Sequence, residues 1–334
     1  MFTISRRYNR TKRNTDRAYP QKMRSVLLQE RPLTAFRTDS LYEKYTAAQT
    51  DKLYLSILKS PCIIKNTDAD FCEHHKKEER NMFHNADFYY FSPAGGTKET
   101  GEIFCAGVSE HVEAVNLGSR DQEIKQPQGE LAVIAVPVYG GRIPSVAAKK
   151  LEKLEGKGTR AVTLVVYGTR AYEDALLEVN HIVEQRGFQV TGSAALVARH
   201  SIVPEVGAGR PDGQDREEIL EFARKVLKKA EEHPEGSVKV PGNYPYKKEM
   251  TVAAAPISLD SCSRCGKCSS VCPTGAVRLE QGVTVTELKS CILCMACVYN
   301  CPERARVLPP SMQEAMEQKL GPLKSVRREP EYFL

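Results

Sequence analysis

The chain has 334 residues, of which 41% are hydrophobic and 27% are charged, so it can bury the cores of two domains. No apolar run approaches the roughly 18 residues that are needed to cross a bilayer, and the first residues lack the apolar segment of a secretory signal. We therefore expect a cytoplasmic protein without a membrane span.

The basic excess of the chain belongs to residues 1–81. They hold 17 Lys and Arg against 10 Asp and Glu, a net charge of +7, whereas the remaining residues hold 31 against 32, a net charge of −1. The basic residues are scattered and no motif organises them, so we expect a poorly ordered leader and no nucleic-acid partner. Patterned sequence begins at Met82, and we hypothesise that the leader is not part of the working fold.

From Met82 onward, apolar runs of strand length alternate with segments of helical period. The apolar runs predict five strands, at 86–93, 112–117, 131–139, 160–168 and 189–198. The segments that follow them predict helices at 96–112, 144–154, 172–187 and 216–233. This alternation predicts an α/β domain over 82–233, with a parallel sheet that is covered by helices on both faces.

A second, smaller region follows this domain. Residues 234–257 are rich in Pro, Gly and Tyr, which predicts a linker. A cysteine-rich domain is expected over 258–308. The tail, 309–334, is expected to form one short helix around 311–320 and an irregular end.

Eight of the eleven cysteines occur in two copies of the pattern C-x2-C-x2-C-x3-C-P. In the bacterial two-cluster arrangement, the first three thiolates of a copy bind one iron–sulfur cube and the fourth binds the other cube. One [4Fe–4S] cluster is then assigned to Cys262, Cys265, Cys268 and Cys301, and the second to Cys291, Cys294, Cys297 and Cys272. The alternatives are weaker, because disulfide frameworks belong to oxidising compartments and zinc sites need no third cysteine at this spacing.

Residues 258–308 resemble a bacterial-type ferredoxin with two [4Fe–4S] clusters, and both copies of the motif are complete. The resemblance implies a small α+β domain that carries single electrons at low potential. The other three cysteines, Cys62, Cys72 and Cys105, show no ligand spacing, and we expect Cys105 to be a small core residue of the first helix.

Three loops at the carboxyl ends of predicted strands offer a site for an anionic, planar ligand. The first, FSPAGGTKETG (91–101), opens a helix, where backbone N–H groups bind anions. The other two, PVYGGRIP (137–144) and YGTRAYED (167–174), supply glycines and aromatic rings. A phosphate loop and two aromatic loops at one edge suit flavin mononucleotide (FMN). In the alternative interpretation, Tyr139 and Tyr172 only cap their loops.

Residues 86–233 resemble a flavodoxin, a doubly wound fold with the strand order 2-1-3-4-5. In that family the first loop binds the FMN phosphate and the other two loops flank the isoalloxazine ring. The resemblance implies phosphate contacts from Ser92, Ala94, Gly95, Gly96 and Thr97. It implies ring contacts from Tyr139, Gly140 and Gly141 on one side and from Gly168, Arg170, Ala171 and Tyr172 on the other.

This sequence departs from the usual flavodoxin loop at two positions. Ala94 stands where a threonine is common, and Gly96 stands where an asparagine is common. A lost hydrogen bond to a charged acceptor costs about 1–3 kcal/mol, so we expect weaker phosphate binding.

Together, the segments SPAGGT, VYGGRIP, VVYGTRAYEDA and HSIVPEVGAGRPD resemble the ferrodoxin family, flavodoxin–ferredoxin fusions found in anaerobic microbes. Flavin exchanges one or two electrons, whereas each cube exchanges one. We therefore expect an electron-transfer protein that relays electrons between FMN and two [4Fe–4S] clusters, and that serves another oxidoreductase or carrier.

Two other interpretations remain open. One is a flavin-dependent reductase of a small substrate, in which the clusters are the electron inlet. Its candidate groups are His200, Glu205, Arg142 and Arg170, although a loop histidine is more often a surface residue. The other is a non-catalytic subunit that the leader tethers to a larger complex. The segment GAGRPDG (207–213) lacks the register of a nicotinamide fingerprint, which disfavours direct oxidation of NAD(P)H.

Overall fold

The computed structural model of this chain describes residues 82–120, 122–232 and 238–334. The expectations for the leader 1–81, with Cys62 and Cys72, lie outside these residues. Among the residues that the structure describes, no helix combines the length and the apolar character that crossing a bilayer requires.

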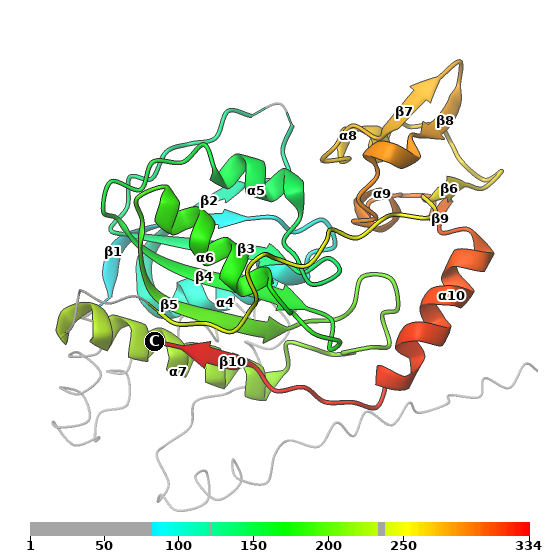
Figure 1. The fold of residues 1–334 in the computed structure, drawn as a ribbon. Coiled ribbons are helices and arrows are strands. Elements are labelled where there is room, and N and C mark those ends of the chain that lie inside the picture. The colour runs from blue at the N-terminus through cyan, green and yellow to red at the C-terminus, as the bar shows by residue number, and fades with distance from the viewer. Residues whose placement is uncertain (1–81, 121, 233–237) are drawn as a thin grey trace, which may run out of the picture. The chain divides into compact units, whose positions relative to one another are not determined.

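Five parallel strands form the centre of the first domain (Figure 1). They are β1 (Phe83–Tyr90), β2 (Ser109–Asn116), β3 (Leu131–Pro137), β4 (Arg160–Tyr167) and β5 (Gln189–Val197). Their order is 2-1-3-4-5, which confirms the doubly wound, flavodoxin-like topology. All but the last residue of β3 are buried, as expected for a strand that has helices on both faces.

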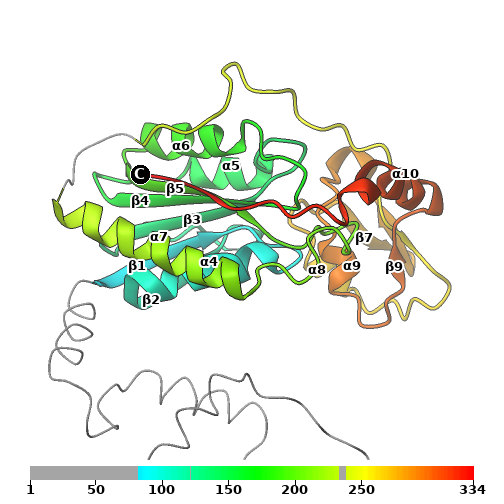
Figure 2. The ribbon, with the colours of Figure 1, turned by 90° about the horizontal axis from the view of Figure 1, so that it is seen from below.

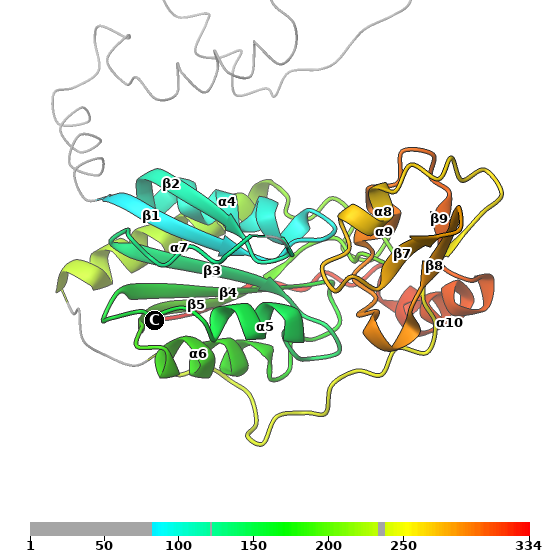
Figure 3. The ribbon, with the colours of Figure 1, turned by 90° about the horizontal axis from the view of Figure 1, so that it is seen from above.

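Two helices cover each face of this sheet. Helices α4 (Gly96–Val108) and α7 (Gly213–Glu232) lie on one side, and α5 (Ser145–Leu151) and α6 (Ala175–Gln185) lie on the other (Figures 2 and 3). The rings of Phe104 and Phe222 lie 5.5 Å apart between α4 and α7. Separate groups of fully buried apolar side chains fill the space under each pair of helices. The predicted parallel sheet with helices on both faces is thus confirmed.

The cysteine-rich region forms a small α+β domain, as expected. Strand β6 (Ile257–Ser258) pairs with β9 (Arg306–Val307), and β7 (Val277–Glu280) pairs with β8 (Val283–Thr286), both antiparallel. Each copy of the cysteine pattern contains one short helix, α8 (Lys267–Ser270) or α9 (Ala296–Tyr299). The helices hold Cys268 and Cys297, which are the third cysteines of their copies, so the two halves repeat in structure as they do in sequence.

The tail differs from its sequence-based expectation. Helix α10 (Pro310–Leu320) is where it was predicted, but the end of the chain forms strand β10 (Glu331–Phe333). This strand pairs antiparallel with β5, so that Tyr332 lies opposite Ala194. It covers one edge of the sheet, which would otherwise present unpaired backbone groups. Three residues are too few for a strand period to appear in the sequence.

Candidate functional site

The loop between β1 and α4 has the geometry of an anion site. Gly95 adopts φ 95°, a left-handed conformation that favours glycine, directly before the first turn of α4. The Ser92 hydroxyl accepts a 2.9 Å hydrogen bond from the backbone N–H of Lys98. The N–H groups of Gly96 and Thr97 belong to the first turn of the helix, where the helix itself offers no acceptors. They can therefore donate to an anion at the positive end of the helix dipole.

A pocket of about 300 Å³ lies at the carboxyl ends of β1, β3, β4 and β5, where open α/β sheets bind ligands. The structure brings nine of the twelve predicted cofactor residues into its lining: Ser92, Ala94, Gly96, Thr97, Tyr139, Gly140, Gly168, Arg170 and Ala171. The other three, Gly95, Gly141 and Tyr172, are in the same loops but do not line it.

Tyr139 lines hollows that residues of both domains share. It lines the pocket, and its ring lies 6.5 Å from that of Phe91. Burial raises the pKa of the Tyr139 phenol well above its usual value, and the nearby thiol of Cys294 raises it further. Tyr139 therefore stays protonated, next to a cysteine that the sequence analysis assigns to a cluster.

His200 packs directly on the second predicted ring loop. A Cβ atom at Gly168 would lie 2.5 Å from the His200 Cδ2 atom, so only glycine fits there. The Nδ1 atom of His200 accepts hydrogen bonds from the backbone N–H groups of Ile202 (3.1 Å) and Val203 (3.2 Å). Its proton is thus on Nε2. Burial, and then the charge of Arg170, lower the pKa of His200 to about 4, so the ring is neutral near pH 7.

Arg170 and Tyr172 already have partners in the protein. The Arg170 guanidinium forms two hydrogen bonds with the Glu173 carboxylate, at 3.1 and 3.0 Å. The Tyr172 side chain is buried and its hydroxyl donates a 2.7 Å hydrogen bond to Glu331 of the C-terminal strand. A ring contact from Tyr172 remains a prediction, and the structure turns its hydroxyl toward the tail.

The linker is fixed to the first domain by a buried carboxylate. Asp174 accepts hydrogen bonds from the backbone N–H groups of Asn243 (2.8 Å) and Lys247 (2.7 Å), and from the Asn243 side chain (3.1 Å). Burial opposes ionisation of Asp174, yet these hydrogen bonds hold the pKa of its carboxyl below the usual value. The next residues of the linker, 250–253, then line the pocket. No local motif marks them, so the sequence analysis missed them.

The second domain and α10 complete the lining of the pocket. They contribute Leu293, Met312, Met316, Lys319 and Leu320. The loop after β5 meets them, because Ile202 and Met312 both pack against the buried group of Leu293, Met295 and Leu308. The Tyr299 hydroxyl also donates a 3.1 Å hydrogen bond to the Ser201 carbonyl oxygen of this loop. The pocket is therefore built by both domains.

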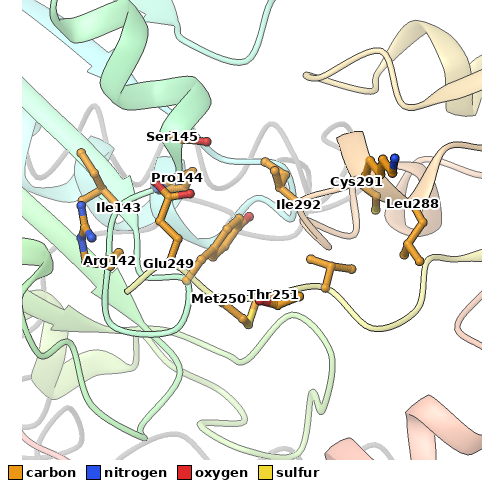
Figure 4. A pocket seen from close by; sticks show the side chains of 13 residues that line it. Arg142, Ile143, Pro144, Ser145, Glu249, Met250, Thr251, Leu288, Cys291 and Ile292 are labelled. Atoms are coloured by element: carbon orange, nitrogen blue, oxygen red, sulfur yellow. The ribbon is translucent and has the colours of Figure 1, made fainter. Parts of the chain in front are cut away.

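A second hollow, of about 400 Å³, adjoins Tyr139 (Figure 4). Its lining contains charged groups of both signs, among them Arg142, Glu249 and Lys289, and it extends to Cys291. The Arg142 guanidinium is held by two hydrogen bonds to Glu178, of 2.7 and 2.6 Å. Glu205, the other group considered for the reductase alternative, is exposed and lines neither hollow.

Four of the predicted cluster ligands line one cavity: Cys272, Cys291, Cys294 and Cys297. Burial raises the pKa of Cys291, Cys294 and Cys297, and Cys272 is close enough to raise each of them further. The structure thus brings the fourth cysteine of the first copy beside the first three of the second copy; their ligation of one cluster stays a prediction. The backbone N–H of Leu293 donates to the Cys291 Sγ atom at 3.4 Å, the kind of bond that adjusts cluster potentials. These residues fit a four-thiolate cluster.

The other predicted set lies nearer the surface. Cys265 is exposed, Cys262 and Cys301 are partly buried, and Cys268 is buried. The backbone N–H of Ala305 donates to the Cys301 Sγ atom at 3.3 Å. Cys105, by contrast, is buried in α4, as expected, and burial raises the pKa of its thiol.

The family described as the 4Fe-4S dicluster domain matches residues 255–302. The chain is a flavodoxin-like domain fused to a ferredoxin-type domain. This fusion matches no curated protein significantly. Among solved structures it is similar to a flavodoxin from the domain Archaea (14% identity, TM-score 0.32, 44% of this chain and 99% of that chain). It is also similar to Fusobacterium nucleatum flavodoxin bound to flavin mononucleotide (15% identity, TM-score 0.32, 44% and 98%), and to oxidised flavodoxin 1 from Bacillus cereus (13% identity, TM-score 0.31, 43% and 97%).

Proposed function

We propose that this protein transfers electrons between FMN, bound in the pocket at the sheet edge, and two [4Fe–4S] clusters, and exchanges them with a separate redox protein. When bound, FMN supplies transfer of one or two electrons and each cluster supplies transfer of one. The proposed domains are the flavodoxin-like 82–233, the linker 234–257, the dicluster domain 258–308 and the tail 309–334, in a cytoplasmic protein.

A single residue, Leu293, carries this proposal, because it lines both the pocket and the four-cysteine cavity. One side chain therefore separates the two sites at this point. Tyr139 supports the same conclusion, since it lines the pocket and its phenol lies within electrostatic reach of the Cys294 thiol. The cluster of Cys272, Cys291, Cys294 and Cys297 is thus the one that exchanges electrons with FMN.

In the proposed FMN site, the first turn of α4 binds the phosphate through backbone N–H groups. The twelve residues assigned from the sequence are proposed as its surroundings, and the linker residues Met250–Ala253 and the neutral His200 are added to them. Leu293, Met312, Met316 and Leu320 give the pocket an apolar wall toward the dicluster domain. An apolar wall lowers the local dielectric and so strengthens the electrostatic interactions of bound groups.

The first experiment is purification without oxygen, followed by analysis of iron, sulfide and flavin. We expect one FMN and about eight iron atoms per chain, as two cubes require. Zinc in place of iron, or a protein without flavin that also fails to bind added FMN, would refute the proposal.

Two cysteine variants then test which cluster exchanges electrons with the flavin. Cys294→Ser removes a ligand of the cluster beside the pocket, whereas Cys265→Ser removes a ligand of the outer cluster. In stopped-flow experiments we expect Cys294→Ser to abolish fast electron exchange with flavin and Cys265→Ser to retain it. Equal loss in both variants, with iron content reduced by half in each, would contradict the assignment of the near cluster.

The hollow in Figure 4 favours one alternative, the flavin-dependent reductase of a small substrate. Its charged lining beside Tyr139 offers a place for a small polar molecule. This function predicts that the reduced protein is reoxidised by a small compound in a saturable manner, and that Glu249→Gln changes the KM. A carrier instead is reoxidised fastest by another redox protein and is indifferent to Glu249→Gln.

A further inference from the structure

A buried arginine of the cysteine-rich domain has no carboxylate partner among the residues that the structure describes. Arg306, in β9, is 1% exposed. Its Nη1 atom donates to the Ser258 hydroxyl at 3.0 Å, and its Nη2 atom donates to the Pro256 carbonyl at 2.6 Å and the Thr286 hydroxyl at 2.7 Å. All three acceptors are neutral, so these contacts satisfy donors but do not balance the charge.

The Nε atom of Arg306 is also buried and has no hydrogen-bond partner. Within the described part of the chain, no Asp or Glu forms a salt bridge with this guanidinium, although the structure gives salt bridges for several other arginines. Burying an uncompensated charge is strongly unfavourable, and an unpaired buried donor adds to that cost. A group this unfavourable needs an anion that the polypeptide itself does not provide.

Cysteines of both sets lie close to Arg306 through the residues that contact or adjoin it. Pro256 and Thr286, which accept hydrogen bonds from Nη2, line the same cavity as Cys272, Cys291, Cys294 and Cys297. In the outer set, the Sγ atom of Cys301 accepts a 3.3 Å hydrogen bond from the backbone N–H of Ala305, the residue directly before Arg306. The guanidinium thus lies beside the cavity of the near set and next in the chain to a residue that binds a ligand of the outer set.

We propose that Arg306 is the internal counter-charge of both clusters and raises their reduction potentials. Each cluster with four thiolates is an anion, and reduction adds one negative charge. A cation fixed in a region of low dielectric stabilises the reduced form more than the oxidised form. The Arg306 charge therefore acts on two redox centres at once and moves both potentials in the same direction.

The proposal rests on the cluster ligation proposed above, which iron and sulfide analysis of the unaltered protein tests separately. Its own test compares three full-length variants by EPR-monitored redox titration: Arg306→Gln, Arg306→Lys and the control Arg304→Gln. Arg304 is exposed and lies two residues away from Arg306. Arg304→Gln removes one positive charge from the chain, as Arg306→Gln does, but removes it from the surface.

We expect Arg306→Gln to lower the reduction equilibrium constant of both clusters at least tenfold, which is about 59 mV for a one-electron couple. Arg306→Lys and Arg304→Gln should stay within about threefold of the unaltered protein. The difference should persist at about 1 M salt, where the Debye length is only about 3 Å, because the charge is buried. Unchanged potentials in Arg306→Gln, or an equal shift in Arg304→Gln, would overturn the proposal.

The potentials of Arg306→Gln are compared once its clusters are shown to be present, so iron content is measured for each variant. Arg306→Gln could lose iron while Arg306→Lys keeps its full iron content and unaltered potentials. That result supports a required positive charge at this position. Loss of iron from both variants shows that the hydrogen bonds of Arg306, and not its charge, are needed, which overturns the proposal.

Discussion

The Tyr172 hydroxyl donates a 2.7 Å hydrogen bond to the Glu331 carboxylate across 159 residues of chain. Tyr172 belongs to a loop at the carboxyl edge of the sheet, and Glu331 begins the strand that covers β5. This bond connects the tail that follows the dicluster domain to the edge of the flavodoxin-like sheet.

Tyr172→Phe should therefore loosen the tail. We expect a loss of about 1 kcal/mol in the free energy of unfolding, since the bond is made to a partly solvated carboxylate. Urea unfolding followed by circular dichroism measures this loss. Glu329→Gln alters a neighbouring carboxylate that binds only the exposed Arg327, and it should change stability by less than about 0.5 kcal/mol. An equal loss in both variants would contradict a specific role for Tyr172.

Gly168→Ala should weaken FMN binding. The new Cβ would lie 2.5 to 2.9 Å from three atoms of His200, so the loop or the histidine must move at the pocket wall. We expect the Kd of FMN to rise at least about tenfold, or 1.4 kcal/mol, as measured by quenching of flavin fluorescence. Gly213→Ala is a matched control, because a Cβ there has no neighbour within 4 Å. Equal affinities for all three proteins would place the flavin elsewhere.

His200 should make the protein less stable in weak acid. Its pKa is about 4 in the folded chain against 6.5 in its usual state, so the unfolded chain binds the extra proton first. Stability therefore falls as pH falls from about 6.5 toward 4, by about 2 kcal/mol between pH 7 and pH 5. His200→Asn can still accept from the backbone N–H groups but does not titrate. A pH dependence of unfolding as steep in this variant as in the unaltered protein would refute the assignment.

Asp174→Ala should release the linker. Two backbone N–H groups lose their acceptor in a partly buried setting, which we expect to cost at least about 2 kcal/mol. Limited proteolysis should then cut within 242–250, where the unaltered protein resists. Because the pKa of Asp174 is lowered, its contribution is present near neutral pH and disappears as the carboxyl protonates in acid. Glu184→Gln, which alters an exposed carboxylate of α6 away from the linker contacts, should leave the linker resistant.

The sequence predicts those parts of the molecule whose structure is specified by residues that are close together in the chain. The strand run LAVIAVP and the repeated cysteine spacing each specify their structure within a dozen residues, and the sheet order and the ferredoxin-type domain are as expected. The role of 250–253, by contrast, depends on Asp174, which lies about seventy residues earlier in the chain. Strand β10 depends on the open edge of β5. Arg306 lies in an ordinary-looking segment, RARVL, and only its burial without a carboxylate reveals it.

Strand β10 fixes the order in which parts of the molecule can be assembled. The residues that close one edge of the sheet follow the whole cysteine-rich region in the chain, so they are synthesised after it. That edge of the sheet is therefore covered only once the cysteine-rich domain has been made. The cysteine-rich domain is then held at both of its ends, by the linker and by the returning strand, which keeps its cysteines at a high effective concentration beside the pocket at the sheet edge.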